Sequence, residues 1–345
     1  MTRTTAVDVR RPRASLLAEC ARAVADVPGQ TWLLAGSFGR REEVWHAGVP
    51  VSDLDLIALT DTPLTAVPAG LLDLETRYRT GSESFRLDIK QISRTDLPKL
   101  AGTLLGRDLA EAVPLTGPAV ELGQLAVPPA LPAAHFLVAN RYAGWLHRAS
   151  WSTLHGESGR WQSLLLQLST CNIVLACVAA RLIAVGAYTP RIADQRRLVD
   201  RRLGPDAAEV FTAAAQLRAS GVLADVPAIA LWREWAPSVL RLLDGLFEPA
   251  AEPSELAHGL SGWTSEAGRS EVRSIPPDDA GTPQRAKHGL QTSTIILAHC
   301  LADPGLQGQL AAVADSSLPG WTGSWSSSRD ALLDTWQEIR RGGRA

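Results

Sequence analysis

The stretch "AGSFGRREEVWHAGVPVSDLDLIAL" (residues 35–59) decides how this chain folds. A Gly-Ser turn and a pair of arginines follow one apolar run, and two aspartates stand inside the next. Ionised side chains in the strand of a packed sheet are costly unless partners compensate their charge. The stretch therefore predicts a turn and a strand that together hold charged groups.

The flanking residues predict three strands separated by helices. The apolar run 31–35 is typical of a short strand, and 52–59 alternates polar and apolar residues before it becomes fully apolar. The run "SFRLDIKQIS" (84–93) alternates in the same way, which predicts a third strand with Asp88 on its polar face. Helical spacing of apolar residues covers 13–27 and 68–79, and "GSFGRREEVW" is interpreted as a turn that leads into a further helix, which "HAGVPV" ends.

Helices and strands alternate only in the first third of the chain. We expect an α/β or α+β domain over residues 1–125, in which helices flank a short mixed sheet. The Pro-rich run 125–135 marks a boundary, and an all-α domain is predicted over 134–345 because strand signals stop there. Residues 248–290, rich in Pro, Gly, Ser and charge, are predicted to form a mobile loop in that domain.

Composition narrows the function classes. The chain has 345 residues and a formal charge of −2, which gives no general attraction to long nucleic acids. Four scattered cysteines without a C-x-x-C pair disfavour disulfides and zinc, so a reducing cytoplasm is expected, and no signal peptide is visible. The apolar run 164–185 carries Gln, Ser, Thr, Asn and Arg, which favours a buried helix over a membrane span. The sequence indicates no oligomeric state.

The aspartates suggest a metal site. Asp53 and Asp55 are two apart on a strand, so their side chains point to one face, and Asp88 joins them if its strand is adjacent. Clustered carboxylates repel one another unless cations lie between them, and oxygen-only ligands select hard divalent ions. We expect two Mg²⁺ ions, with Mn²⁺ as an alternative.

The turn supplies groups that suit a phosphate. Gly36 lets the backbone approach a ligand closely, and Ser37 offers a hydroxyl and backbone N–H groups where a helix begins. Gly39 keeps the turn uncrowded, and Arg40, one turn further, is expected to bind the same phosphates.

Taken together, "GSFGR", "SDLDL" and "LDIK" resemble the signature of the nucleotidyltransferase superfamily typified by DNA polymerase beta. The resemblance covers about residues 30–95 and is similar to bacterial members that act on small molecules. It implies that Asp53, Asp55 and Asp88 bind two metal ions, that Gly36 and Ser37 hold the NTP phosphates, and that Asp88 helps to deprotonate the attacking hydroxyl. The segment between Ser37 and Asp53 is longer than in many members, and "EEVWHAGVP" is interpreted as an inserted loop.

Each candidate residue also has a purely structural interpretation. The aspartates of 53–55 could be solvated carboxylates at a strand edge, Ser37 could be a helix N-cap, and Asp88 could belong to an exposed charge ladder with Arg86 and Lys90. Arg40 could pair with Glu42 on a solvated helix. The basic cluster 189–203 contains Arg191 and Arg197, which either reach the triphosphate or an anionic acceptor or belong to a solvated helix of mixed charge.

The predicted function is transfer of a nucleoside monophosphate from an NTP, such as ATP, to a hydroxyl or phosphate of a small molecule, with release of pyrophosphate. A sugar, an antibiotic or a secondary metabolite fits the chain's size and charge as the acceptor, which the helical domain is expected to bind. The alternatives are a non-catalytic nucleotide-binding regulator, or an enzyme that modifies a protein or tRNA in the manner of toxin-type AMP transferases.

Overall fold

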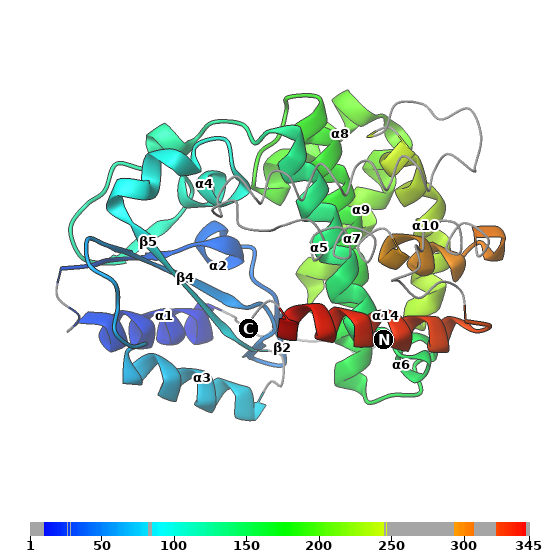
Figure 1. The fold of residues 1–345 in the computed structure, drawn as a ribbon, viewed down its shortest axis with the longest axis horizontal. Helices are drawn as coiled ribbons and strands as arrows, with labels where there is room; N and C mark the ends of the chain where they lie inside the picture. Colours follow the sequence, from blue (N-terminus) through cyan, green and yellow to red (C-terminus); the bar gives the residue numbers. More distant parts are fainter. Residues whose placement is uncertain are drawn as a thin grey trace. The chain divides into compact units, whose positions relative to one another are not determined.

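The computed structural model describes residues 10–25, 27, 29–81, 85–244, 246, 293–306 and 322–342. The predicted loop at 248–290 lies outside these residues. The protein is a mixed α/β chain with a small mixed sheet and many helices, as the sequence predicted at this coarse level. Figure 1 shows the strands confined to the first third of the chain and helices beyond it.

The chain divides into two compact units. The N-terminal unit consists of residues 1–129 together with 190–192 and 219–222, and the helical unit contains the remainder. Two short segments from the helix-rich part of the sequence therefore pack with the N-terminal unit. From the sequence alone, both segments were expected in the helical domain.

The N-terminal unit is built on a four-stranded sheet in the order β5-β4-β1-β6. Strand β1 is antiparallel to both β4 and β6, whereas β4 and β5 are parallel. The strands are β1 (Thr31–Leu34), β4 (Leu54–Thr60), β5 (Leu87–Ser93) and β6 (Val113–Thr116), with the separate hairpin β2 (Trp45–His46) and β3 (Val49–Pro50).

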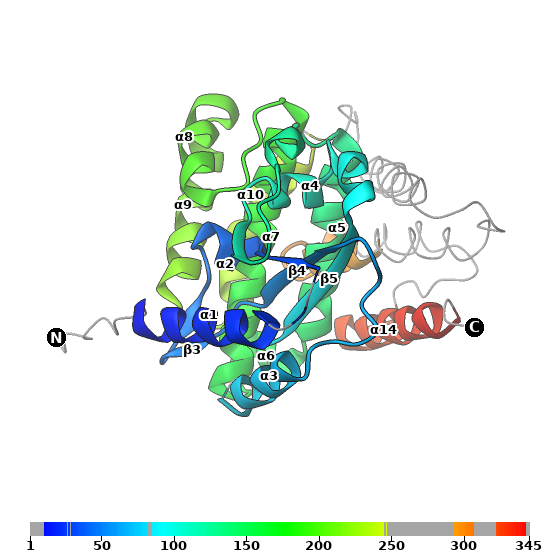
Figure 2. The same ribbon diagram turned by 90° about the vertical axis from the view of Figure 1, so that its left-hand side faces the viewer.

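Helices cover both faces of this sheet. Figures 1 and 2 show α1 and α3 side by side on one face, where Trp32, Leu54 and Leu56 point into the shared core. The other face carries Ile57 and Leu59 and is covered by the later segments of the unit. These helices are α1 (Arg10–Ala25), α2 (Gly36–Arg40), α3 (Ala69–Gly81), η1 (Arg94–Leu100), α4 (Leu104–Leu109) and η2 (Gly123–Leu125).

The segment after the Gly-Ser turn differs from the prediction. Helix α2 ends at Arg40, because Arg41 adopts the left-handed conformation with φ of 62° and its N–H caps the helix. The segment "EEVWHAGVP", which was interpreted as an inserted loop, contains the β2–β3 hairpin. Strand β6 was also missed, because the run "VPLT" is short and contains a proline, as edge strands tolerate.

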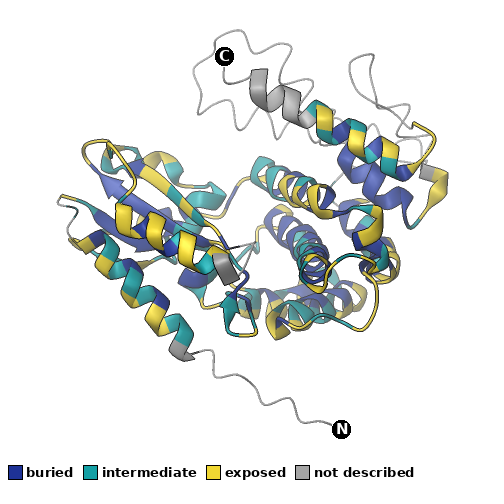
Figure 3. Cartoon of the chain, turned by 90° about the horizontal axis from the view of Figure 1, so that it is seen from below, coloured by how far each residue is buried: buried dark blue, intermediate teal, exposed yellow. Residues whose placement is uncertain are grey.

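The helical unit is organised around α7. This helix packs against α5 and α10, and most of its residues are buried. The described helices of the unit are α5 (Leu131–Arg148), α6 (Trp151–His155), α7 (Arg160–Ala184), α8 (Ile192–Leu203), α9 (Pro205–Ser220), α10 (Ala228–Asp244), η3 (Pro304–Leu306) and α14 (Trp325–Gly342), and residues 293–300 are also helical. Figure 3 shows the dark blue of buried residues along the inner sides of the helices.

Among the described helices, α7 alone is long and apolar enough to cross a membrane, and 83% of its most apolar window is buried inside the protein. A helix covered in this way fits the predicted core helix better than a membrane span. Trp145 and Trp232 lie fully buried beside it, and all four cysteines are buried and form no disulfide.

The β2–β3 hairpin holds the segment 219–222 in the N-terminal unit. Nδ1 of His46 donates a hydrogen bond of 2.7 Å to the carbonyl of Gly221. Gly221 has a φ of +59°, and a Cβ at this position would lie 2.0 Å from the carbonyl oxygen of Trp45. Only a glycine fits so close to the hairpin backbone.

We therefore expect Gly221→Ala to destabilise the protein by about 2–4 kcal/mol, since it adds a backbone clash to the cost of a left-handed alanine. Gly186→Ala is the matched control, because Gly186 has a similar φ of +67° and no atom within 4 Å of its Cβ position. It should cost only about 1 kcal/mol. Thermal denaturation of both variants measures the difference, and equal melting temperatures would contradict the close packing.

Candidate active site

The parallel pairing of β4 with β5 brings two of the predicted carboxylates together. In this register the Cα atom of Asp55 lies opposite that of Asp88. Ile57 lies two residues after Asp55 and Ile92 lies four residues after Asp88, so each isoleucine points to the same face of the sheet as its aspartate. Both isoleucines pack into the apolar cluster on that face. Asp55 and Asp88 therefore project from that same face, near the start of each strand.

Asp53 lies just before the first residue of β4 and is exposed. It precedes Asp55 by two residues, and its negative charge contributes to raising the pKa of Asp55. The three predicted acids thus belong to one electrostatic neighbourhood. Asp53 lies at its solvent side and Asp55 at its inner side.

The Gly-Ser turn directly adjoins Asp55. The N–H of Ala35 donates a 3.0 Å hydrogen bond to the carbonyl of Asp55 as the chain leaves β1. Gly36 follows with a φ of +58°, and a Cβ there would lie 1.9 Å from Oδ2 of Asp55. Any larger residue at 36 would therefore occupy the space of this carboxylate.

Ser37 and Gly39 complete the turn. Ser37 is partly exposed in the first turn of α2. Gly39 is buried, and a Cβ there would lie 2.6 Å from the carbonyl oxygen of Leu34. Gly39 thus lets α2 pack closely on the end of β1.

Arg40 is held by carboxylates. Its Nη1 pairs with Oδ1 of Asp108, and its Nε pairs with Oε2 of Glu42 at 3.1 Å. The Arg40 side chain is 16% exposed. These contacts make Arg40 a link between α2 and α4, and a phosphate would have to compete with two carboxylates for it.

Asp108 is a fourth acid of the neighbourhood, which the sequence analysis missed. It lies in α4, and its charge raises the pKa of both Asp55 and Lys90. The sequence offered no local signal for it, because its partner Arg40 is 68 residues away.

Lys90 provides a positive charge among the acids. Its Nζ lies 2.9 Å from Oδ2 of Asp88, two residues earlier on the same face of β5. Burial disfavours the charged ammonium, but the hydrogen bond that Lys90 donates to Asp88 and the charges of Asp88, Asp55 and Asp108 outweigh it and raise the pKa of Lys90. The sequence analysis noted Lys90 only as a member of a possible charge ladder.

The pKa of Asp55 is raised to about 6. Burial is the main cause, and the negative charges of Asp88, Asp108 and Asp53 add to it, while Lys90 acts in the opposite direction. A partly buried carboxylate beside like charges is ionised only at a cost in free energy. Such strain is typical of residues that serve chemistry more than stability.

The two arginines from the basic cluster lie in different units. Arg191 belongs to the N-terminal unit, where its Nε pairs with Oε2 of Glu111 at 2.9 Å. The neighbouring N–H of Ile192 donates to Oε1 of Glu42. Arg197, in the helical unit, is largely exposed on α8 with Asp194 4.0 Å away. Arg191 therefore holds the segment 190–192 against the N-terminal unit. Arg197 lies on a solvated helix of mixed charge, which is the structural alternative given for this cluster.

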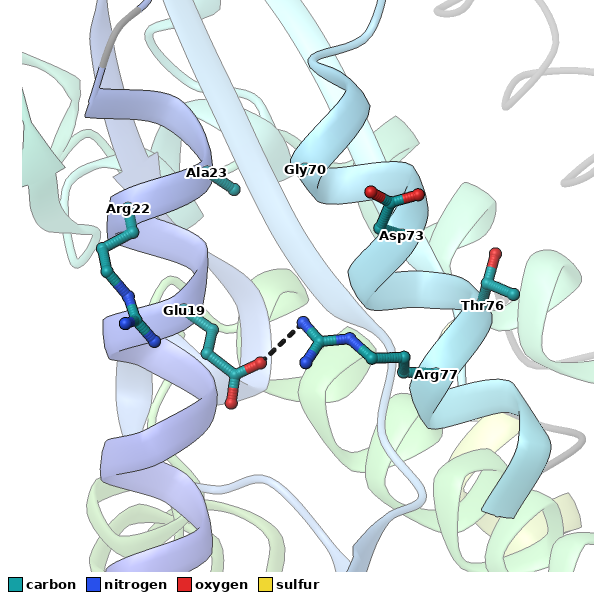
Figure 4. A pocket seen from close by; sticks show the side chains of 7 residues that line it. All are labelled: Glu19, Arg22, Ala23, Gly70, Asp73, Thr76 and Arg77. Carbon is teal, nitrogen blue, oxygen red and sulfur yellow. Dashed lines mark ion pairs between the residues drawn. The ribbon is translucent and has the colours of Figure 1, made fainter.

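A shallow pocket lies elsewhere on the N-terminal unit. It opens between α1 and α3, where Glu19 and Arg77 form an ion pair of 2.7 Å (Figure 4). The two helices cover the opposite face of the sheet from the one that Asp55 shares with Ile57. The pocket is therefore separate from the carboxylates.

The candidate ligands suit a hard divalent cation in their chemistry, and the backbone beside them is placed to accommodate one. Its members are carboxylate oxygens, and a glycine stands where a side chain would fill the space beside Asp55. As the side chains stand, no three His, Cys, Asp or Glu residues in the described part of the chain are grouped to hold a metal. The ammonium of Lys90 is the cation that Asp88 contacts in this arrangement.

Comparison with known proteins identified no relative of this chain. No family model matches the chain, and no significant match to a curated protein or to a solved structure was found. The resemblance carried by residues 30–95 therefore remains an interpretation of motifs.

The raised pKa predicts how Asp55 affects stability. The folded-state pKa of about 6 exceeds the unfolded value near 4, so the native state binds more protons between these values. Stability without divalent ions should fall as pH rises from about 4 to 6 and stay lowered above it. Asp55→Asn removes this charge and should raise the free energy of unfolding at pH 7 by about 1–3 kcal/mol.

Thermal denaturation in EDTA across pH 4–8 measures this effect. The gain of Asp55→Asn over the wild type should disappear near pH 4, where both proteins are uncharged at residue 55. A variant that is equally stable or less stable at pH 7 would show that the carboxylate is not strained.

Proposed function

We propose that this chain is a divalent-cation-dependent nucleotidyltransferase of the DNA polymerase beta type. The observation that carries the proposal is the register of Asp55 opposite Asp88, with the Gly36 backbone against the Asp55 carboxylate. The resemblance in "GSFGR", "SDLDL" and "LDIK" supplies the reaction class, and the geometry supports it by bringing the three motifs to one end of one sheet.

The proposed reaction transfers a nucleoside monophosphate from an NTP, such as ATP, to an acceptor hydroxyl or phosphate. A bond forms between the acceptor oxygen and the α-phosphorus, the bond from that phosphorus to the bridging oxygen breaks, and pyrophosphate leaves. The hydroxyl proton passes to a base. Asp88, exposed at the start of β5, is the proposed base or orienting group for that hydroxyl.

The proposed ligands for two Mg²⁺ ions, or for Mn²⁺ in their place, are Asp53, Asp55 and Asp88. When bound, the ions would neutralise the triphosphate and stabilise charge on the attacking and leaving oxygens. Gly36 and Ser37 would contact the phosphates through the backbone and the partly exposed hydroxyl. Arg40 has a different proposed role, because its pairs with Glu42 and Asp108 suit a residue that positions the turn.

The proposed acceptor is a small molecule such as a sugar, an antibiotic or a secondary metabolite, in the cytoplasm. The near-neutral charge of the chain favours such an acceptor over tRNA. A protein acceptor, as in toxin-type AMP transferases, is the alternative within the same reaction class.

One observation favours a second candidate, a nucleotide-binding regulator without turnover. Lys90 contacts Asp88 and Arg40 contacts Asp108, so part of the negative charge is already compensated within the protein. A regulator would bind nucleotide and release no pyrophosphate. Pyrophosphate release therefore separates the two functions.

The decisive experiment incubates the protein with each of the four NTPs, Mg²⁺ or Mn²⁺ and a library of metabolites, with pyrophosphate as the readout. We expect release to depend on one class of acceptor. Asp55→Asn should reduce it by about two orders of magnitude or more, because a proposed ligand of the metal ions that stabilise the transition state is lost.

Asp96→Asn is the matched control. Asp96 is an exposed acid of η1 that pairs with Lys99 and contributes no charge to Asp55 among the causes of its pKa shift. This variant should keep wild-type turnover. If Asp55→Asn also kept it, the assignment of the carboxylates would be wrong.

A further inference from the structure

The position of Lys90 raises a question about how the site changes its charge. In the structure the ammonium of Lys90 lies 2.9 Å from Asp88, the residue proposed to contact both metal and acceptor. The same ammonium interacts with the charges of Asp55 and Asp108. A divalent ion that bound Asp88 would therefore meet a positive charge already in place.

We propose that Lys90 is an exchangeable counter-ion of the site, which releases Asp88 when a metal–nucleotide complex binds and then pairs with a phosphate of that nucleotide. This inference rests on the proposed function, because it concerns the same carboxylates. The exchange leaves neither Lys90 nor Asp88 without an opposite charge. One pair, Lys90 with Asp88, is replaced by two, the divalent ion with Asp88 and Lys90 with phosphate.

The exposure of the pair makes this exchange inexpensive. Both side chains are 47% exposed, and an ion pair in such a position contributes only about 0.2–1 kcal/mol. Lysine carries a compact charge on a flexible four-carbon stem, which lets the ammonium move between neighbouring anions without movement of the backbone. It also binds phosphate well as a point charge.

Arg40 does not have these properties. Its side chain is 16% exposed and contacts two carboxylates, Glu42 and Asp108, from separate elements. Releasing it would break both contacts and leave Asp108 without the arginine. The structure therefore distinguishes a fixed cation, Arg40, from an exchangeable one, Lys90.

The exchange couples metal binding to nucleotide binding. A metal ion alone must displace Lys90 from Asp88 without offering the ammonium a new anion. A metal ion that arrives with a nucleotide brings phosphate oxygens with which the ammonium can pair. Coupling of this kind is reciprocal, so each ligand should raise the affinity of the other. Removing the ammonium should strengthen binding of the metal alone and weaken the coupling.

The test is a titration of Mn²⁺ followed by its electron paramagnetic resonance signal, with and without a non-hydrolysable NTP analogue. For Lys90→Met we expect the affinity for Mn²⁺ alone to increase about two- to fivefold, which corresponds to the worth of an exposed ion pair. The factor by which the analogue increases Mn²⁺ affinity should fall by a similar amount. Lys90→Gln, which retains a polar side chain, should behave in the same way, and circular dichroism checks that both variants fold.

Lys99→Met is the matched control, because Lys99 forms a comparable pair with Asp96, at 2.6 Å, on η1. It should leave Mn²⁺ affinity and coupling unchanged. If Mn²⁺ binds the wild type and both Lys90 variants alike, the counter-ion proposal is overturned and the proposed function stands. If Mn²⁺ binds neither the wild type nor the variants, even with the analogue, both proposals fail.

Discussion

The parallel pairing of β4 with β5 is the constraint on which the rest of the site depends. A shift of one residue in this register would turn Asp88 to the apolar face that holds Trp32 and Leu56, where an ionised carboxylate is costly. The apolar residues of both strands prevent the shift, because Leu87 and Ile89 pack with that cluster only in the observed register. The core therefore determines where the charges lie.

Most of the sheet could be predicted from the sequence, and the errors have physical causes. Strand β1 and most of β4 are apolar, buried runs, and β5 alternates polar and apolar residues, so all three are visible in the sequence. The end of α2 depends on Arg41 adopting a left-handed conformation, which propensity does not favour for arginine. A tertiary contact stabilises that turn, since Arg13 of α1 donates a hydrogen bond to the carbonyl of Phe38. A local hydrogen bond from the N–H of Glu42 to the carbonyl of Ser37 adds to it.

The candidate site was predictable only where its residues are close in sequence or share a motif. The face to which Asp55 points follows from strand geometry, and its proximity to Gly36 follows from β1 pairing with β4. The pair of Arg40 with Asp108 joins residues on two short helices, and no periodicity in either segment indicates it. Arg40 consequently looked like a free phosphate ligand in the sequence, and its carboxylate partners became visible only in three dimensions.

The charge arrangement also explains why a stable fold would keep so unfavourable a group as Asp55. Replacing a carboxylate whose pKa is raised to about 6 by a neutral residue would relieve repulsion from Asp88 and Asp108. A purely structural role would not favour an ionised oxygen at this position. The unfavourable charge of Asp55, the ion pair of Lys90 with Asp88 and the fixed position of Arg40 would suit the proposed cation site, because an added positive charge would turn the repulsion among the carboxylates into attraction.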